Sequence, residues 1–269
     1  MQDNKITSTQ NRLSILQWLH RFGWLNIRQI SELVWTDKKS GLAMAQKTIA
    51  SMLESKLIIK RKLDTGNEAI LLASKGVSLL NSELNIKAAS GAKLKLGNAV
   101  HRCASNWYLI QEIKNGNKNF ISEFEIQSGK VNFKNSYGKV PDGLVITDFG
   151  VIWLEVENSW KNISERQKIV HFCSDTLSHN SLMEELWSDN FLFRVKVVAI
   201  TPYSAEAIVR SFAKDFKDGL ITETALQSVW LTYAPMSSNL IYPKDEEIKN
   251  FDIWYDLVRH CIEGKPVKF

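Results

Sequence analysis

Two short apolar segments joined by a tight turn constrain the fold of this chain more than any other stretch. Residues 140–146 (VPDGLVI) and 151–157 (VIWLEVE) have the alternation and branched side chains of β-strands, and the letters TDFG between them are typical of a turn. They predict an antiparallel hairpin. Alternate residues of a strand share a face, so Glu155 and Glu157 point to the same side. Counting outward from the turn places Asp142 opposite Glu155.

The three carboxylates of this hairpin predict a metal site. Clustered acids repel one another unless a proton or a cation lies between them. Oxygen ligands at a partly open site suit Mg²⁺ or Mn²⁺. Such an ion lowers the pKa of its bound water and stabilises the charge on a phosphodiester under in-line attack. A solvated acidic strand edge gives the same alternation, but the Pro-Asp-Gly start of the hairpin favours the metal site.

The segments around the hairpin predict a mixed α and β domain. A helix precedes it, and a strand read from alternation in FISEFEI lies between that helix and the hairpin. Helices and β-branched strands then alternate, and the chain ends in a helix. The predicted elements are helix 97–114, strand 120–126, the hairpin, helix 164–177, strand 193–201, helix 205–216, strand 228–234 and helix 246–263.

The first 80 residues follow a different plan, because three helices precede a hairpin. The helices are predicted at 11–22, at 27–34 after the capping residue Asn26, and at 42–57. Two strands joined by the turn DTGN follow. This order is that of the winged-helix variant of helix-turn-helix proteins, in which the third helix enters the major groove and the hairpin wing contacts phosphates.

Double-stranded DNA is therefore the expected partner of this region. The third helix offers hydrogen-bonding groups, and the wing offers cations that neutralise phosphates without reading sequence. The expected DNA-binding residues are Gln46, Lys47, Thr48, Ser51, Lys60, Arg61 and Lys62. A winged helix that binds only protein is the alternative.

Charge divides the chain in the same direction. The first 140 residues carry 21 basic and 10 acidic side chains, a net charge of +11, and the rest carry 13 and 19, a net charge of −6. A basic half favours a polyanion partner, although scattered solvated lysines give the same balance. The expected organisation is a winged helix over 8–80, a polar linker over 81–96 and a second domain over 97–269.

Other features exclude several classes of protein. The three cysteines lack CxxC spacing, so neither a disulfide framework nor a zinc knuckle is expected, and a reducing cytoplasm fits them. The polar start has no signal-peptide core. No run of about 18 apolar residues predicts a membrane span. The chain is expected to be cytoplasmic.

The hairpin resembles the signature of PD-(D/E)xK nucleases. The matching residues are Pro-Asp-Gly at 141–143 and Glu-Val-Glu at 155–157, and helix, three strands, helix, strand is the core order of that superfamily. Lysine is usual at the last position, where this chain has Glu157, as some restriction endonucleases do. Lys161 is the candidate to supply the ammonium group that this lysine would provide, and Lys139 is a weaker candidate.

A narrower resemblance covers roughly residues 10–200. A winged helix followed by LASKGVSLL, then His101 and Asn106 on a helix, then PDG and LEVENSWK, is similar to the replication-relaxation family, which includes MobC-type plasmid mobilisation relaxases. It implies a restriction-endonuclease-like mixed sheet flanked by helices. It also implies an endonuclease that recognises and nicks an origin of transfer, with other relaxosome proteins as possible partners.

The resemblance implies roles for the acids. Asp142 and Glu155 bind Mg²⁺ or Mn²⁺ with the phosphate, and Glu157, standing where the lysine would be, joins the metal ligands. Either Glu157 or Lys161 aligns the attacking water.

Residues upstream of the hairpin complete the expected site. An acid on strand 120–126 adds a metal ligand, Glu125 by preference, with Glu123 on the same face left open. His101 contacts a phosphate or orients a water, and a structural role for this histidine is also open.

Two rival functions remain at this point. The chain could be a non-catalytic DNA-binding regulator or relaxosome accessory that keeps the nuclease fold as a scaffold, which the missing lysine favours. It could also be a transposase-like or restriction-type nuclease that cuts both strands.

Overall fold

The structure is a computed structural model in which residues 2–36, 38–131, 139–158, 163–178, 192–237 and 242–269 are described. The chain divides into two compact units, Met1–Gly116 and Asn117–Phe269. Within the described ranges, no helix is both long and apolar enough to cross a membrane.

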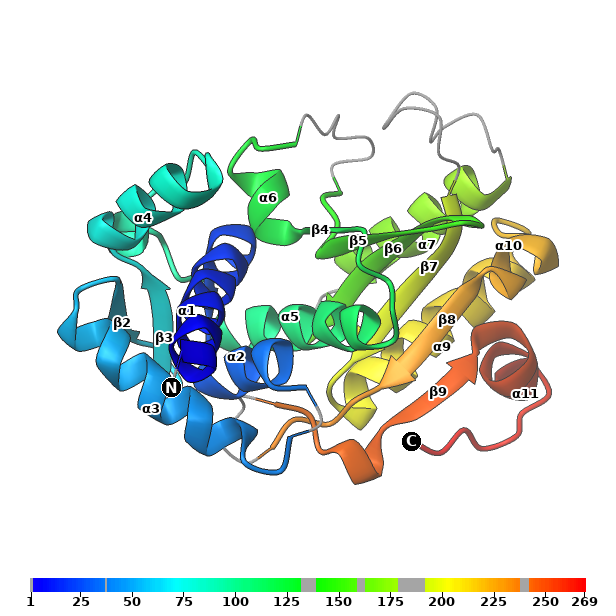
Figure 1. Ribbon diagram of the computed structural model, residues 1–269. Coiled ribbons are helices and arrows are strands. Elements are labelled where there is room, and N and C mark those ends of the chain that lie inside the picture. Colours follow the sequence, from blue (N-terminus) through cyan, green and yellow to red (C-terminus); the bar gives the residue numbers. More distant parts are fainter. Residues whose placement is uncertain (1, 37, 132–138, 159–162, 179–191, 238–241) are drawn as a thin grey trace. The chain divides into compact units, whose positions relative to one another are not determined.

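The first unit combines helices with a small antiparallel sheet of strand order β1-β3-β2 (Figure 1). Its elements are α1 (Gln2–Phe22), β1 (Trp24–Leu25), α2 (Ile27–Val34), α3 (Gly41–Glu54), β2 (Ile58–Lys62), β3 (Glu68–Leu72), α4 (Ser74–Leu84), the 3₁₀ helix η1 (Gly91–Lys93) and α5 (Ala99–Lys114).

Local capping explains where α2 begins. The Asn26 side chain accepts a hydrogen bond from the Gln29 amide at 2.9 Å, and the Gln29 side chain accepts one from the Asn26 amide at 3.1 Å. This reciprocal capping box starts α2. The turn between β2 and β3 contains Gly66 at φ +82°, a conformation that favours glycine. The three expected helices and the hairpin are present.

Residues 81–96 belong to the first unit and are not a free linker. Helix α4 continues to Leu84, and η1 packs so closely on β3 that a Cβ on Gly91 would lie 2.6 Å from the Leu71 Cβ. The Arg61 guanidinium donates to the Leu94 carbonyl at 2.5 Å. The polar composition of residues 81–96 suggested a linker. The contacts that hold this segment join residues far apart in the sequence, so composition alone does not reveal them.

Helix α5, expected to open the second domain, groups with the first unit. Gln29 donates to the Cys103 carbonyl at 3.1 Å, and Asn106 donates to the Trp24 carbonyl at 3.3 Å. Both bonds are buried, so they attach α5 firmly to the segment around α2.

The second unit is a six-stranded mixed sheet flanked by helices, with strand order β4-β5-β6-β7-β8-β9 (Figure 1). Strands β6, β7 and β8 are parallel and the other pairs are antiparallel. Its elements are β4 (Phe120–Ser122), α6 (Glu123–Gln127), β5 (Gly143–Thr147), β6 (Gly150–Glu157), α7 (Ile163–Ser178), β7 (Leu192–Ala199), α9 (Pro202–Lys217), α10 (Glu223–Gln227), β8 (Val229–Tyr233), the 3₁₀ helix η2 (Asp245–Glu247), β9 (Lys249–Asp252), the π-helix η3 (Ile253–Val258) and α11 (Arg259–Ile262).

Helices α7 and α9 cross between the parallel strands and pack on one face of the sheet. The shared core contains Trp153, Val195 and Val197 from the strands, with Phe172 from α7 and Phe212 from α9. The rings of Trp153 and Phe172 lie 4.3 Å apart. Odd-numbered residues of β6 therefore face α7, and this face includes Glu155 and Glu157.

Two predicted elements are wrong. The strand predicted over 120–126 ends at Ser122, whose hydroxyl accepts from the Glu125 amide at 3.1 Å and so starts α6. The helix predicted over 246–263 begins as β9, because this segment pairs with the exposed edge of β8. It becomes helical only after Asp252, whose carboxylate accepts from the Trp254 and Tyr255 amides at 3.0 Å.

Candidate metal and phosphate site

Three acids lie in one row across adjoining segments of the second unit. Ser122 pairs with Gly143, and Gly143 pairs with Leu154. The neighbours of these paired residues, one position beyond each pair, are Glu123, Asp142 and Glu155. The Asp142 amide donates to the Leu154 carbonyl at 2.9 Å, which continues the β5–β6 ladder beyond Gly143. The pairing of the hairpin around its turn is confirmed.

Asp142 is fixed by the backbone of β6. Its side chain is 9% exposed, and its Oδ2 accepts from the Val156 amide at 2.7 Å. The Asp142 carboxylate thus accepts a hydrogen bond from β6 where a backbone carbonyl would accept it in a regular ladder. A hydrogen bond to a charged acceptor is short and strong, so Asp142 has a defined position.

Glu155 is held at both of its oxygens. It is 3% exposed, Oε1 accepts from Trp153 Nε1 at 2.7 Å, and Oε2 lies 2.9 Å from Lys139 Nζ. Burial raises the pKa of Glu155, Lys139 opposes this shift, and the negative charge of Asp142 adds to it. Glu155 is therefore engaged with a cation of the chain itself.

Lys139 supplies an ammonium group to the row of acids. Its side chain is 12% exposed. Burial lowers the pKa of Lys139, but Glu155, Glu157 and Asp142 together hold it above its ordinary value. The lysine is charged at neutral pH. Sequence reasoning ranked it below Lys161, which lies outside the described residues.

Glu157 lies two residues beyond Glu155 on the same strand and is 2% exposed. It shares the face of Glu155, as the alternation predicted, and its charge acts on Lys139. The last acid of β6 is thus buried beside Glu155, and the ammonium group near both comes from Lys139, before β5.

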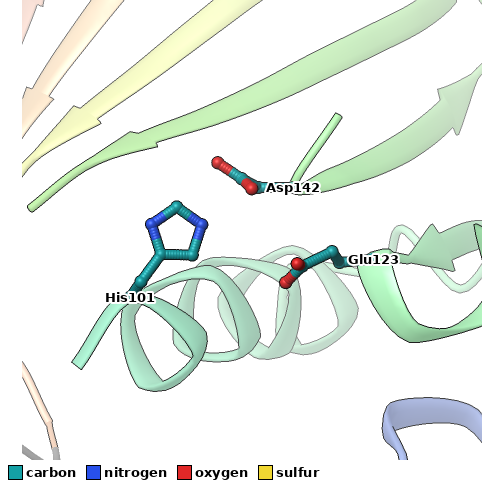
Figure 2. A group of neighbouring side chains, drawn as sticks. All are labelled: His101, Glu123 and Asp142. Atoms are coloured by element: carbon teal, nitrogen blue, oxygen red, sulfur yellow. The ribbon is translucent and has the colours of Figure 1, made fainter. Parts of the chain in front are cut away.

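Figure 2 labels Glu123 and Asp142, two acids of the second unit that could bind a metal ion, and His101, a possible ligand type from the first unit. Glu123 and Asp142 belong to the second unit, and a carboxylate oxygen of each lies within 4.8 Å of the other. Across the described part of the chain, no other set of three such residues meets this geometry. Glu155 and Glu157 are outside the group, so the acids do not converge as the expected metal set requires.

Glu125, the preferred upstream acid, has a structural use. Its Oε2 accepts from the Ser122 amide at 3.0 Å, which completes the capping box of α6. Glu123, the first residue of α6, is the acid beside Asp142. The pattern Ser-x-x-Glu in SEFE is the capping-box signature, and it could have assigned Glu125 to the cap.

His101 lies in the first turn of α5, in the first unit. Its amide donates to Asn98 Oδ1 at 3.2 Å, and Asn98 is the N-cap of the helix. Figure 2 draws its ring with the two acids, on the helix that carries it.

The expected DNA-reading residues of α3 differ in their surroundings. Gln46 and Lys47 are exposed, and Thr48 is half-buried. Ser51 accepts a hydrogen bond from Arg12 at 2.9 Å. Of the four expected residues, Gln46 and Lys47 are therefore the ones open to a ligand.

The expected phosphate-binding residues of the β2–β3 hairpin also differ in their surroundings. Lys62 is exposed, and Lys60 forms a surface ion pair with Glu68 at 2.6 Å. Arg61 is bonded to the Leu94 carbonyl and so holds the 91–94 segment against the sheet. We therefore assign Arg61 a structural role.

No protein-family model, no curated protein and no solved structure matches the chain. Chemically, the second unit offers two carboxylates within reach of one cation and a charged lysine beside them. Those groups can bind a divalent ion and an anion together.

Proposed function

We propose that this protein is a Mg²⁺- or Mn²⁺-dependent DNA endonuclease that nicks one strand. The observation that carries the proposal is the row Glu123, Asp142 and Glu155, with Lys139 bonded to its last member. Carboxylates and an ammonium in one place are the groups that a phosphodiester needs for cation binding and charge neutralisation.

The donor set fits a divalent cation. Glu123 and Asp142 of the second unit offer carboxylate oxygens, which Mg²⁺ and Mn²⁺ prefer. When bound, the ion would polarise the phosphate and lower the pKa of a coordinated water.

Lys139 takes the place that the signature gives to its last residue. Glu155 orients the ammonium, which neutralises charge on the phosphate. In this hydrolysis the water oxygen bonds to phosphorus and loses a proton, the bond to one deoxyribose oxygen breaks, and that oxygen takes up a proton. The role proposed for Glu157, next on the same face, is to align the attacking water, and its charge acts on Lys139.

The first unit would provide DNA recognition. Its helices and hairpin follow the winged-helix order, with Gln46 and Lys47 exposed on α3 and Lys62 on the wing. Together with the relaxase resemblance, this supports an origin of transfer as the target and relaxosome proteins as partners.

A non-catalytic DNA-binding protein is the second candidate. The specific observation in its favour is that both oxygens of Glu155 are already bonded, to Trp153 and to Lys139. A pair neutralised in this way stabilises the sheet without binding a metal.

Supercoiled plasmid carrying a candidate origin of transfer, incubated with Mn²⁺ with and without EDTA, tests the proposal. We expect open circles from the wild type, none with EDTA and none from Asp142→Asn. Asp218→Asn is the matched control, because this acid is exposed and pairs only with its helix neighbour Lys214. Linear product would identify a double-strand nuclease. Intact plasmid with DNA binding retained would support the non-catalytic candidate.

A further inference from the structure

A cluster of aromatic rings and cations extends over β7 and β8 from the turn that precedes β6. We call it the aromatic patch, and its members are Phe149, Phe193, Arg194, Lys196 and Trp230. The rings of Phe149 and Phe193 lie 5.9 Å apart. The Arg194 guanidinium lies 4.7 Å from the Phe193 ring and 3.9 Å from the Trp230 ring. Lys196 Nζ lies 5.9 Å from the Trp230 ring.

Strand register builds this patch. Lys196 is the pairing partner of Trp230, and Arg194 lies two residues before Lys196, so all three share a face. That face is opposite to the one covered by α7 and α9, which takes Val195 and Val197.

A register shift brings Phe193 into contact with its neighbour. Val151 pairs with Leu192 and Ile152 with Arg194, which leaves Phe193 as an extra residue. Such a bulge bends the strand and redirects a side chain, and here it places the Phe193 ring beneath Arg194 and beside Phe149.

Exposure and charge indicate a ligand. Phe149 is 70% exposed, the largest exposed fraction of the large apolar side chains in the described ranges. Residues 141–269 have a net charge of −6, yet the patch holds two cations. An exposed ring beside cations offers the groups that stack a base and neutralise phosphates.

We propose that the aromatic patch binds single-stranded nucleic acid, with a base stacked on Phe149 and phosphates on Arg194 and Lys196. A duplex keeps its base faces covered, so exposed rings favour a single strand. Along the chain Phe149 lies six residues before Glu155, roughly 20 Å at the rise of a strand. The proposal deepens the proposed function, on which it rests for this role: the patch would hold the unpaired strand that leaves the nicking site.

Binding of a fluorescein-labelled oligothymidylate of about 16 nucleotides, followed by anisotropy in EDTA, tests the patch apart from cutting. Phe149→Ala is expected to weaken binding by about 5- to 150-fold, the effect of one stacked base. Tyr255→Ala, which removes another exposed ring of the same unit, should leave affinity unchanged.

Salt dependence separates the two kinds of contact. Arg194→Gln is expected to reduce the slope of log affinity against log salt by about 0.7, whereas Phe149→Ala should leave the slope unchanged. Since Arg194 packs on Trp230, circular dichroism checks that its variant is folded, and the exposed Phe149 provides a second variant free of that concern.

Equal affinity of Phe149→Ala and Tyr255→Ala for the single strand would overturn the proposal, and so would tighter binding of the matching duplex. A patch that binds single strands while plasmid stays intact would refute the nuclease and leave the patch standing. If the protein nicks plasmid but Phe149→Ala binds oligothymidylate as tightly as the wild type, the patch alone would be refuted.

Discussion

At the scale of single residues, the partner of each acid decides its use. Hairpin spacing and alternation are local, so the sequence predicted that Asp142 faces Glu155 and that Glu155 and Glu157 share a face. The partners come from elsewhere in the chain: Lys139 reaches Glu155, and Glu123 reaches Asp142. No single-sequence pattern encodes those meetings, which is why the expected metal set and the observed group differ.

Removing Lys139 should be costly because its partner is buried. Lys139→Met leaves the Glu155 carboxylate without its cation, and we expect the free energy of unfolding in urea to fall by about 3–5 kcal/mol. Adding Glu155→Leu should restore much of the loss, since an apolar pair often replaces a buried ion pair without penalty. Lys244→Met, in an exposed pair with Glu247, should barely move the urea midpoint. A similar small effect of Lys139→Met would show that the buried pair is absent.

The pH dependence of stability should carry the signature of Glu155. Burial raises its pKa, so the folded protein holds the proton more tightly than the unfolded chain does. Stability should therefore fall as pH rises from the ordinary glutamate value through the raised one. Glu155→Gln should remove this part of the slope in urea midpoints measured from pH 4 upward. An unchanged slope would mean that another group titrates there.

At the scale of elements, local signals predicted most helices and strands and failed where two signals competed. FISEFEI alternates like a strand, but Ser122 and Glu125 form a capping box that starts α6 and carries Glu123 to the site. Likewise, 246–252 has a helical composition, but the open edge of β8 recruits it as β9. In the first case a local cap overrides the alternation, and in the second tertiary pairing overrides propensity.

The cap of α6 should control metal binding. Ser122→Ala removes the hydroxyl that accepts from the Glu125 amide, and we expect a loss of about 1 kcal/mol in stability with weaker Mn²⁺ binding by calorimetry. Thr222→Ala is the matched control, because Thr222 caps α10 in the same way. It should reduce stability and leave Mn²⁺ affinity unchanged. Equal Mn²⁺ affinities of the two variants would show that the cap of α6 does not control metal binding.

At the scale of the whole molecule, each unit has one buried cysteine that reports on its own core. Burial raises the pKa of Cys103 in α5 to about 12 and raises that of Cys173 in α7, so neither thiol is a thiolate at pH 8. We expect only the half-buried Cys261 to react with iodoacetamide in the native protein. In increasing urea, mass spectrometry should detect alkylation of Cys103 when the first unit opens and of Cys173 when the second opens. Because Lys139 stabilises only the second unit, Lys139→Met should move the Cys173 transition to lower urea and leave the Cys103 transition in place. A joint shift of both thiols would show that the two units unfold as one cooperative body.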